Sequence, residues 1–248
     1  MGKLDDTTAL VTGGSRGIGR GIAEGFAAEG ARAAINYRSS EDAAREVAES
    51  IEDDGGEAIA VEADVSDPEA VEGMVAKCED EFGRIDVLVN NAGLLTQSPL
   101  VEMDLDQWRD TIDTDLTGTF LVTRNVVPGM LDSGSGKVIN VTSQLGIKGA
   151  EEMTHYSAAK GGVISFTRAL AREVGPEVQV NAIAPGPIET DMLDDITEEW
   201  RENKEAELPL ERLGAVEDVV PTAVLLASDG GDYYTGQTLS PDGGDAMH

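Results

Sequence analysis

The sequence predicts a doubly wound α/β fold, in which helices cover both faces of one parallel β-sheet. Two observations predict it. Short apolar runs typical of buried strands alternate with amphipathic helical stretches along the chain, and a glycine-rich turn joins the first such run to the first helix. No linker, low-complexity segment or repeat interrupts this alternation. We therefore expect a single domain over residues 1–248, with about seven strands.

The expected elements follow in chain order. Pro68 favours the start of a helix, because the N–H that proline lacks would have no partner in the first turn. Strands are expected at residues 7–12, 32–37, 57–61, 86–89, 137–141, 178–182 and 237–239. Helices are expected from the glycine-rich turn to about residue 30, at 41–54, 68–82, 105–132 and 216–227, and around Tyr156 as far as about residue 174.

Unusual residues follow six of the expected strands. In a doubly wound sheet, ligands bind at the carboxyl ends of the strands, near the point where the strand order reverses. The residues that follow strands one to six are, in order, the glycines of 13–19, Arg38, Asp64, residues 90–93, Ser143 and residues 185–190. Their agreement in position predicts one ligand site along this edge of the sheet.

The glycine-rich turn has the form Gly13-x-x-x-Gly17-x-Gly19. Glycines allow a tight turn and a close approach of the backbone, and the helix that follows offers amides and a positive dipole end to a pyrophosphate. The turn therefore predicts a dinucleotide site. The residues expected to contact the cofactor here are Gly13, Ser15, Arg16, Gly17, Ile18 and Gly19.

Tyr156 and Lys160 are four positions apart on an expected helix, so they share one face. An ammonium beside a phenol favours the phenolate and lowers the phenol pKa from ~10 towards neutrality. A phenol tuned in this way can give a proton to a carbonyl oxygen or take one from an alcohol. By itself the spacing is also typical of two surface residues on a helix.

The motifs together resemble those of the short-chain dehydrogenase/reductase family. Residues 12–19, Asn90-Asn-Ala-Gly93, Ser143, Tyr156-x-x-x-Lys160 and Pro185-Gly186 occur in the family's order and at its intervals, over almost the whole chain. The resemblance implies a single Rossmann domain and hydride transfer between a nicotinamide cofactor and a carbonyl or alcohol. It also implies a homotetramer, or in some members a dimer.

The resemblance also implies roles for individual residues. Tyr156 is the general acid/base, Lys160 lowers its pKa and holds the nicotinamide ribose, and Ser143 hydrogen-bonds the substrate oxygen. Asp64 and Thr190 each have an alternative role as helix caps, and Asn90 is expected to tie strands together. The implied cofactor contacts beyond the glycine-rich turn are Asp64, Val65, Asn91, Ala92, Gly93, Tyr156, Lys160, Pro185, Gly186, Ile188 and Thr190.

One position departs from the family pattern. Asp115 stands where the family usually carries the asparagine that supports a water-linked proton relay from the lysine. The change removes an NH2 donor and adds a charge beside Lys160, which leaves the catalytic role of Asp115 open. His155 is not expected to act as a base, because adjacent helical residues do not share a face.

The end of the second expected strand indicates the choice of nicotinamide. NAD-binding sites of this kind normally use a carboxylate there, for the ribose 2′-hydroxyl. Here no acidic residue precedes Glu41, whereas Arg38, Arg16 and Ser39 could bind a 2′-phosphate. We therefore expect NADP(H), with NAD(H) as the alternative, and no metal ion.

The substrate remains open between two subgroups of the family. The second half resembles 3-oxoacyl-(acyl carrier protein) reductases, and the first half also resembles glucose 1-dehydrogenases. A third alternative is a catalytically idle NADP(H)-binding regulator. An acidic insert at about residues 191–213 is expected to cover the substrate as a lid, or simply to pack on the domain. Its apolar side would consist of Met192, Leu193, Ile196 and Trp200.

The charge balance is extreme, with 48 acidic and 18 basic residues and a net charge of -30. Such a charge repels nucleic acid, anionic membranes and acidic carrier proteins, so a coenzyme A thioester or another small carbonyl compound is the favoured substrate. The even spread of acidic residues indicates adaptation to a high-salt cytoplasm, because molar salt screens repulsion beyond ~3 Å. Cys78, the single cysteine, and the lack of a long apolar run also favour a cytoplasmic protein.

Overall fold

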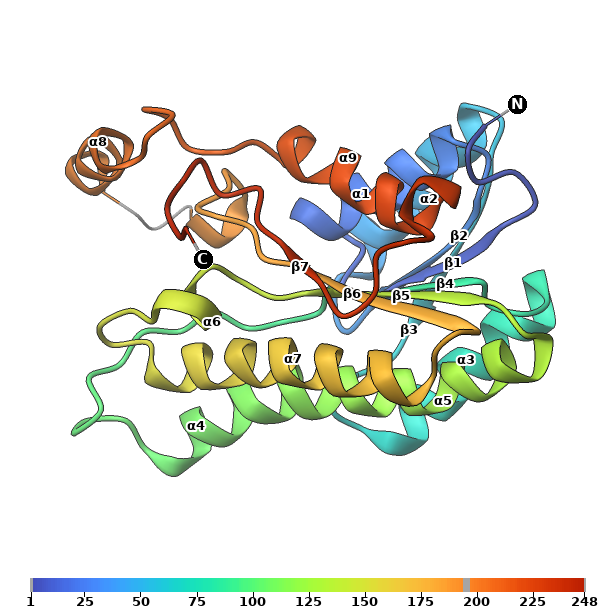
Figure 1. The fold of residues 1–248 in the computed structure, drawn as a ribbon, viewed down its shortest axis with the longest axis horizontal. Coiled ribbons are helices and arrows are strands. Elements are labelled where there is room, and N and C mark those ends of the chain that lie inside the picture. The colour runs from blue at the N-terminus through green and yellow to red at the C-terminus, as the bar shows by residue number, and fades with distance from the viewer. Residues whose placement is uncertain (1, 194–196, 248) are drawn as a thin grey trace.

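The computed structural model describes residues 2–193 and 197–247. These residues form a sheet of seven parallel strands in the order β3-β2-β1-β4-β5-β6-β7, with helices on both faces (Figure 1). The predicted doubly wound α/β fold is confirmed. The strands are β1 (Thr8–Val11), β2 (Arg32–Tyr37), β3 (Glu57–Glu62), β4 (Val87–Asn90), β5 (Gly136–Val141), β6 (Val178–Ile183) and β7 (Thr238–Leu239).

The strand order reverses at β1, which pairs with β2 on one side and with β4 on the other. Leu10 of β1 lies between Ala34 and Leu88 in the register. The loops that follow β1 and β4 therefore leave the sheet side by side, and a crevice opens between them. This crevice is where the sequence predicts the ligand.

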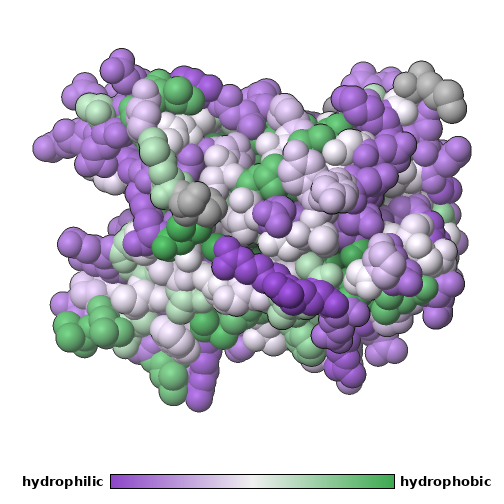
Figure 2. Space-filling model, in the orientation of Figure 1, coloured by the Kyte–Doolittle hydropathy of each residue, from purple (hydrophilic) through white to green (hydrophobic). Residues whose placement is uncertain are grey.

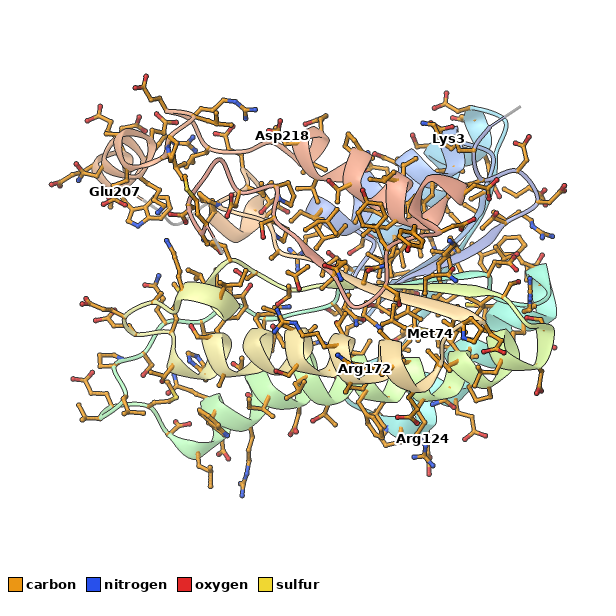
Figure 3. The ribbon with its side chains drawn as sticks, in the orientation of Figure 1. Lys3, Met74, Arg124, Arg172, Glu207 and Asp218 are labelled. Atoms are coloured by element: carbon orange, nitrogen blue, oxygen red, sulfur yellow. The ribbon has the colours of Figure 1, made fainter. Side chains whose placement is uncertain are left out.

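Two apolar layers hold the helices on the sheet. On one face, Phe26 of α1 is fully buried in the apolar layer that α1 shares with α2 and α9 (Figure 1). Met74 lies in the apolar layer on the other face (Figures 1 and 3). The helices of the first face are α1 (Gly17–Ala28), α2 (Glu41–Asp53) and α9 (Val216–Ala227). Those of the second face are α3 (Pro68–Phe82), α4 (Leu105–Ile112), α5 (Gly118–Ser133) and α7 (Thr154–Glu173).

The helix expected at residues 105–132 differs from the prediction. It is divided into α4, a π-helical segment at Asp113–Thr117, and α5. A π-helical turn contains one more residue than an α-helical turn and is frequent at functional sites. Here it contains Asp115, whose side chain is fully buried.

The insert expected to act as a lid contains a short 3-10 turn, Asp191–Leu193, and the helix α8 (Glu198–Glu207). The Thr197 side chain caps α8 by accepting a hydrogen bond from the Trp200 amide (3.1 Å). Figure 1 shows α8 standing away from the sheet, and hydrophilic side chains cover much of this face of the molecule (Figure 2). Trp200 is partly exposed, whereas Ile196 and the Met192 side chain lie outside the described residues.

Two further short elements complete the chain, namely α6 (Leu145–Lys148) and a 3-10 turn at Asp229–Gly231. Cys78 is buried and not in a disulfide. Within residues 2–193 and 197–247, every helix is too short or too polar to cross a lipid bilayer.

Candidate active site

The glycine-rich turn is held against the end of β4. The side-chain amide of Asn91 donates through Nδ2 to the backbone carbonyls of Thr12 and Gly13, both at 3.0 Å. In return, the Thr12 hydroxyl accepts hydrogen bonds from the backbone N–H groups of Asn91 (2.9 Å) and Ala92 (3.0 Å). Gly13 has a φ of 61°, and a Cβ there would lie 2.9 Å from the Cα of Ala92. The side chains of Asn91 and Thr12 thus fix the main chain in one wall of the crevice.

The first turn of α1 offers free amides to the crevice. Arg16 is the N-cap residue, and its side chain makes no capping hydrogen bond among the described residues. Helix α3 differs, since Asp67 caps it by accepting from the Glu69 amide (2.9 Å). An uncapped helix N-terminus without an acidic first turn attracts an anion. The pyrophosphate of a dinucleotide fits this position.

A groove of about 470 Å³ runs from this turn along the strand ends. Most of the predicted cofactor contacts line it, namely Gly13, Ser15, Arg16, Gly17, Ile18, Arg38, Ser39, Asp64, Val65, Asn91, Ala92, Gly93 and Thr190. Gly19 does not line it. A Cβ at Gly19 would lie 2.3 Å from the Gly13 carbonyl oxygen, so this glycine allows the close packing of the turn itself.

At the end of the groove beside β2, Arg38 Nη1 lies 3.9 Å from Asp64 Oδ2, and both side chains are partly exposed. Asp64 does not cap α3. Its Oδ1 accepts from the amide (2.9 Å) and the hydroxyl (2.7 Å) of Ser66. Burial alone would raise the pKa of Asp64, but the Ser66 hydrogen bonds and the Arg38 charge lower it. Arg38 is thus held only loosely at the groove.

Tyr156, Lys160 and Ser143 are all buried, and the Ser143 hydroxyl is close enough to the phenol to lower the pKa of Tyr156. None of the three lines the groove, although Tyr156 and Lys160 were expected to contact the cofactor. Lys160 Nζ is 5.6 Å from the centre of the Tyr156 ring and donates to the Val141 carbonyl at 3.3 Å. Gly146 lets α6 pack on this part of α7, because a Cβ there would lie 2.7 Å from the Lys160 carbonyl carbon. A hydroxyl, a phenol and an ammonium are thereby gathered in one place.

Asp115 faces the same lysine. Its Oδ2 lies 3.2 Å from Lys160 Nζ, and its Oδ1 accepts from the Leu94 amide at 2.7 Å. Gly93 leaves the space for this pair, since a Cβ there would be 3.0 Å from Asp115 Oδ2 and 3.1 Å from Lys160 Nζ. The carboxylate therefore contacts the lysine directly.

The ionisation of this cluster differs from the expectation for Tyr156. Burial raises the pKa of the Tyr156 phenol; Lys160 lowers it and Asp115 raises it, and the net direction is upward. Burial lowers the pKa of Lys160, but the Asp115 and Tyr156 charges raise it above its usual value. Burial raises the pKa of Asp115, against the opposing charge of Lys160. In the protein without ligands, Tyr156 is therefore a protonated acid beside a charged lysine.

His155 is fully buried, and its Nε2 lies 2.7 Å from the Thr96 hydroxyl. Burial lowers the pKa of this histidine. Its hydrogen bond joins the loop after β4 to α7, a structural contact. Asn90 is structural as well, since its amide donates to Thr123 (2.9 Å) and to Asn140 of β5 (2.8 Å). This contact confirms the expectation that Asn90 ties strands together.

The loop after β6 reaches the groove at Thr190, whose Cγ2 would lie 3.3 Å from a Cβ at Gly17. Gly186 packs on the chain near the C-terminus, and a Cβ there would lie 2.7 Å from the Cα of Asp242. Ile188 is buried and pairs with Gly214 in an isolated bridge. Thr190 donates to the Ile188 carbonyl (3.5 Å), and among the described residues its side chain makes no hydrogen bond that caps a helix. Pro185, Gly186 and Ile188 do not line the groove, unlike Thr190.

Two residues around Ser143, Gln144 and Asp245, were not expected at the site. The Ser143 hydroxyl donates to Gln144 Oε1 at 2.7 Å, and Gln144 Nε2 donates to Asp245 Oδ2 at 3.0 Å. Asp245 is 101 positions away in the sequence, so no local pattern indicates the contact. Asn36 was also missed, although its Oδ1 accepts from the Gly13 amide (3.2 Å).

Known proteins resemble this chain over nearly its whole length. A family model described as enoyl-(acyl carrier protein) reductase matches residues 13–245. The 3-oxoacyl-[acyl-carrier-protein] reductase of Synechocystis is 45% identical over all of both chains. The corresponding reductase FabG of Staphylococcus aureus is 42% identical over 96% of this chain and 97% of its own.

Two solved structures have the same fold, each with a TM-score of 0.93. A putative gluconate dehydrogenase from Agrobacterium tumefaciens is 36% identical, and a short-chain type dehydrogenase/reductase from Mycobacterium marinum is 33% identical. Both comparisons cover 97% of this chain and 96% of the other.

Proposed function

The chain belongs to the short-chain dehydrogenase/reductase family and is an oxidoreductase, and from that premise we propose that it uses NADPH to reduce the ketone of a 3-oxoacyl thioester. The observation that carries the proposal is the buried set of Ser143, Tyr156 and Lys160. Gly93 connects this set to the groove, because it lines the groove and a Cβ there would lie 3.1 Å from Lys160 Nζ. The relatives named as 3-oxoacyl reductases support the choice of substrate. Because the chain is an oxidoreductase, the alternative of a catalytically idle NADP(H)-binding regulator is dropped.

The fit of a nicotinamide dinucleotide rests on the free amides of α1 and on the length of the groove. When bound, the cofactor supplies a hydride to the substrate carbonyl carbon. Arg38 and Arg16 lie at the groove, and no acidic residue stands between β2 and Glu41. Two guanidinium groups bind a 2′-phosphate better than a 2′-hydroxyl, which supports NADP(H) over NAD(H).

Tyr156 acts as the general acid in the proposed reaction. Its phenol gives a proton to the ketone oxygen, which becomes the hydroxyl of the product as the carbonyl carbon is reduced. Burial keeps the phenol protonated before the reaction. The Lys160 charge then stabilises the phenolate that remains. Ser143 orients the ketone oxygen by a hydrogen bond.

Asp115 acts through Lys160 in this proposal, as a positioning residue. Its carboxylate lies 3.2 Å from Lys160 Nζ and is itself held by the Leu94 amide. The pair keeps Lys160 charged at alkaline pH, because the pKa of Lys160 is raised. A direct ion pair thus stands where the family uses an asparagine.

The proposed substrate is a coenzyme A thioester rather than a carrier-protein thioester, because at moderate salt the net charge of -30 repels an acidic carrier protein. Molar salt screens this repulsion. The proposal also includes one domain over residues 1–248, a lid at about residues 191–213, a homotetramer in the cytoplasm, and adaptation to high salt. A sugar dehydrogenase is the second candidate, supported by the likeness to the putative gluconate dehydrogenase.

The test is a side-by-side assay in ~2 M KCl, where charge repulsion is screened. NADPH oxidation is followed with acetoacetyl-CoA, crotonyl-CoA and a simple ketone, and NADP reduction is followed with glucose. We expect the highest kcat/KM with acetoacetyl-CoA. A preference for crotonyl-CoA would support an enoyl reductase, and turnover of glucose alone would support the sugar dehydrogenase. Either result would overturn the proposal.

A further inference from the structure

Asp245 is the meeting point of two of the six lysines in this acidic chain. Lys148, at the end of α6, and Lys204, on α8, each donate to Asp245 Oδ1 at 2.7 Å. The Asp245 side chain is only 7% exposed and that of Lys204 13%. Burial raises the pKa of Asp245, but the lysines and Gln144 lower it overall, so the group is a carboxylate.

The turn that carries Asp245 is itself fixed. Asp242 accepts hydrogen bonds from the amides of Gly244 and Ala246, both at 2.9 Å. Gly243 and Gly244 have positive φ values, 67° and 91°, that other residues rarely adopt. The turn therefore presents the Asp245 carboxylate in one place.

The carboxylate also sets the direction of the hydrogen bonds that lead to Ser143. An ionised carboxylate only accepts hydrogen bonds, so the NH2 group of Gln144 must face Asp245 (3.0 Å). The Gln144 carbonyl oxygen then has to face Ser143, whose hydroxyl donates to it at 2.7 Å. The Leu145 amide donates to Ser143 Oγ (3.1 Å) and to Gln144 Oε1 (2.8 Å). Ser143 Oγ is thus held between two fixed groups.

The same carboxylate is bound to the proposed lid. Lys204 belongs to α8, and the chain after α8 packs on the turn of Asp245. The Leu210 amide donates to the Gly243 carbonyl (3.3 Å), and a Cβ at Gly244 would lie 2.7 Å from the Pro209 ring. One buried carboxylate therefore contacts both the lid helix and the residue that holds Ser143.

We propose that Asp245 is a positioning residue for the reaction, which fixes Ser143 through Gln144 and anchors α8 beside it through Lys204. The inference rests on the proposed function, in which Ser143 contacts the substrate oxygen. When the ketone binds, the Ser143 O–H rotates towards it while Oγ stays in place. A misplacement of ~1 Å in such a group can lower the rate by up to ~10²-fold.

The test compares four variants with the wild type in ~2 M KCl. Asp245→Asn keeps the size of the side chain but allows the Gln144 amide to turn over, Asp245→Glu keeps the carboxylate, and Lys204→Met releases α8. Lys137→Met is the matched control, because Lys137 makes an ion pair with Asp232 away from the cleft. The readouts are kcat and KM for acetoacetyl-CoA, the Kd of NADPH, and hydrogen exchange at the Leu145 amide and over 198–207.

We expect Asp245→Asn to lower kcat about tenfold, with the Kd of NADPH within about twofold and faster exchange at Leu145. Asp245→Glu should restore most of kcat. Lys204→Met should raise the KM for acetoacetyl-CoA severalfold and speed exchange in α8, and Lys137→Met should change nothing. A wild-type kcat in Asp245→Asn, or a parallel loss of NADPH binding, would overturn the inference.

Failure of the proposed function gives a different result. If the wild type reduces acetoacetyl-CoA poorly but another carbonyl compound well, the same variants are compared on that substrate. If the wild type reduces none, hydrogen exchange still decides the inference. Unchanged exchange at Leu145 and in α8 of Asp245→Asn would show that the carboxylate holds neither group.

Discussion

The cofactor half of the site is held by hydrogen bonds between uncharged side chains and the main chain, whereas the substrate half is held by charged side chains. In the first, Asn91 binds the carbonyls of Thr12 and Gly13, and backbone amides line the turn. In the second, Lys148 and Lys204 converge on Asp245. The uncharged contacts demand glycine in the turn and the side chains of Thr12 and Asn91. The charged contacts depend on Asp245 and its two lysines, so a single substitution there can change the substrate half without altering the turn.

The ion pairs at the two ends of the insert follow the same pattern. Arg201 pairs with Glu189, and Arg212 lies 2.7 Å from Asp218. Figure 3 shows Glu207 on α8 and Asp218 at the start of α9. The hydrogen bonds from Arg212 lower the pKa of Asp218 to about 2. These ion pairs are partly exposed, and the insert is also bound to the body by the buried side chains of Leu208 and Leu213.

Tyr156→Phe should have the largest effect on kcat, and it should leave NADPH binding in the cofactor half unchanged. Removing the phenolic hydroxyl removes the general acid, which contributes up to ~10⁴-fold, so we expect kcat to fall about 10³-fold. The Kd of NADPH, measured by fluorescence, should stay within about twofold. Surviving turnover would mean that the proton comes from another group.

Arg38→Glu should act on the cofactor half alone. Charge-assisted hydrogen bonds are worth ~1.5–3 kcal/mol, so the KM for NADPH should rise at least about tenfold more than the KM for NADH. Arg45→Glu is the matched control, because Arg45 pairs with Glu41 on the surface of α2. Equal changes in both KM values would contradict the NADP(H) assignment.

Asp115→Asn tests whether the Asp115 charge acts on Tyr156, at the place where the cofactor half and the substrate half of the site meet. The Asp115 charge raises the pKa of Tyr156, so its removal should lower that pKa. Because reduction needs the protonated phenol, the decline of kcat at alkaline pH should move towards lower pH. In the oxidation direction, the rise of kcat should move the same way. A shift to higher pH would show that Asp115 acts on Tyr156 by another route.

The smallest expected effect is that of salt on the thermal stability of the protein. Raising KCl from ~0.1 to ~2 M screens the repulsion among the acidic side chains, and we expect Tm to rise by several degrees. NaCl at equal ionic strength serves as the control for screening. A falling Tm in both salts would contradict adaptation to high salt.

The strands and most helices could be predicted because each one has a local pattern. The range 68–82, for example, agrees with α3 at both ends. The π-helical segment could not be predicted, since residues 105–132 have a helical composition throughout and the change is one of hydrogen-bond register. The position of Asp115 at Lys160 was expected from the family pattern, but the direct ion pair was not.

The site was predicted where it depends on motifs and missed where it depends on long-range contacts. Tyr156 and Lys160 lie together as the spacing indicated, and Ser143, whose role the family resemblance implied, lies close to Tyr156. The pKa of Tyr156 moves opposite to the expectation, because burial outweighs the Lys160 charge, and burial cannot be read from a four-residue spacing. Asp245 contacts Lys148 from 97 positions away, and only the fold brings them together.

The most direct measurement of the proposed reaction is isotope transfer from NADPH deuterated at both C4 positions of the nicotinamide. With acetoacetyl-CoA in ~2 M KCl, mass spectrometry of the product should show one deuterium at the hydroxyl-bearing carbon for each NADP formed. The same product without deuterium, or NADPH oxidation without a hydroxyacyl product, would contradict hydride transfer to the ketone.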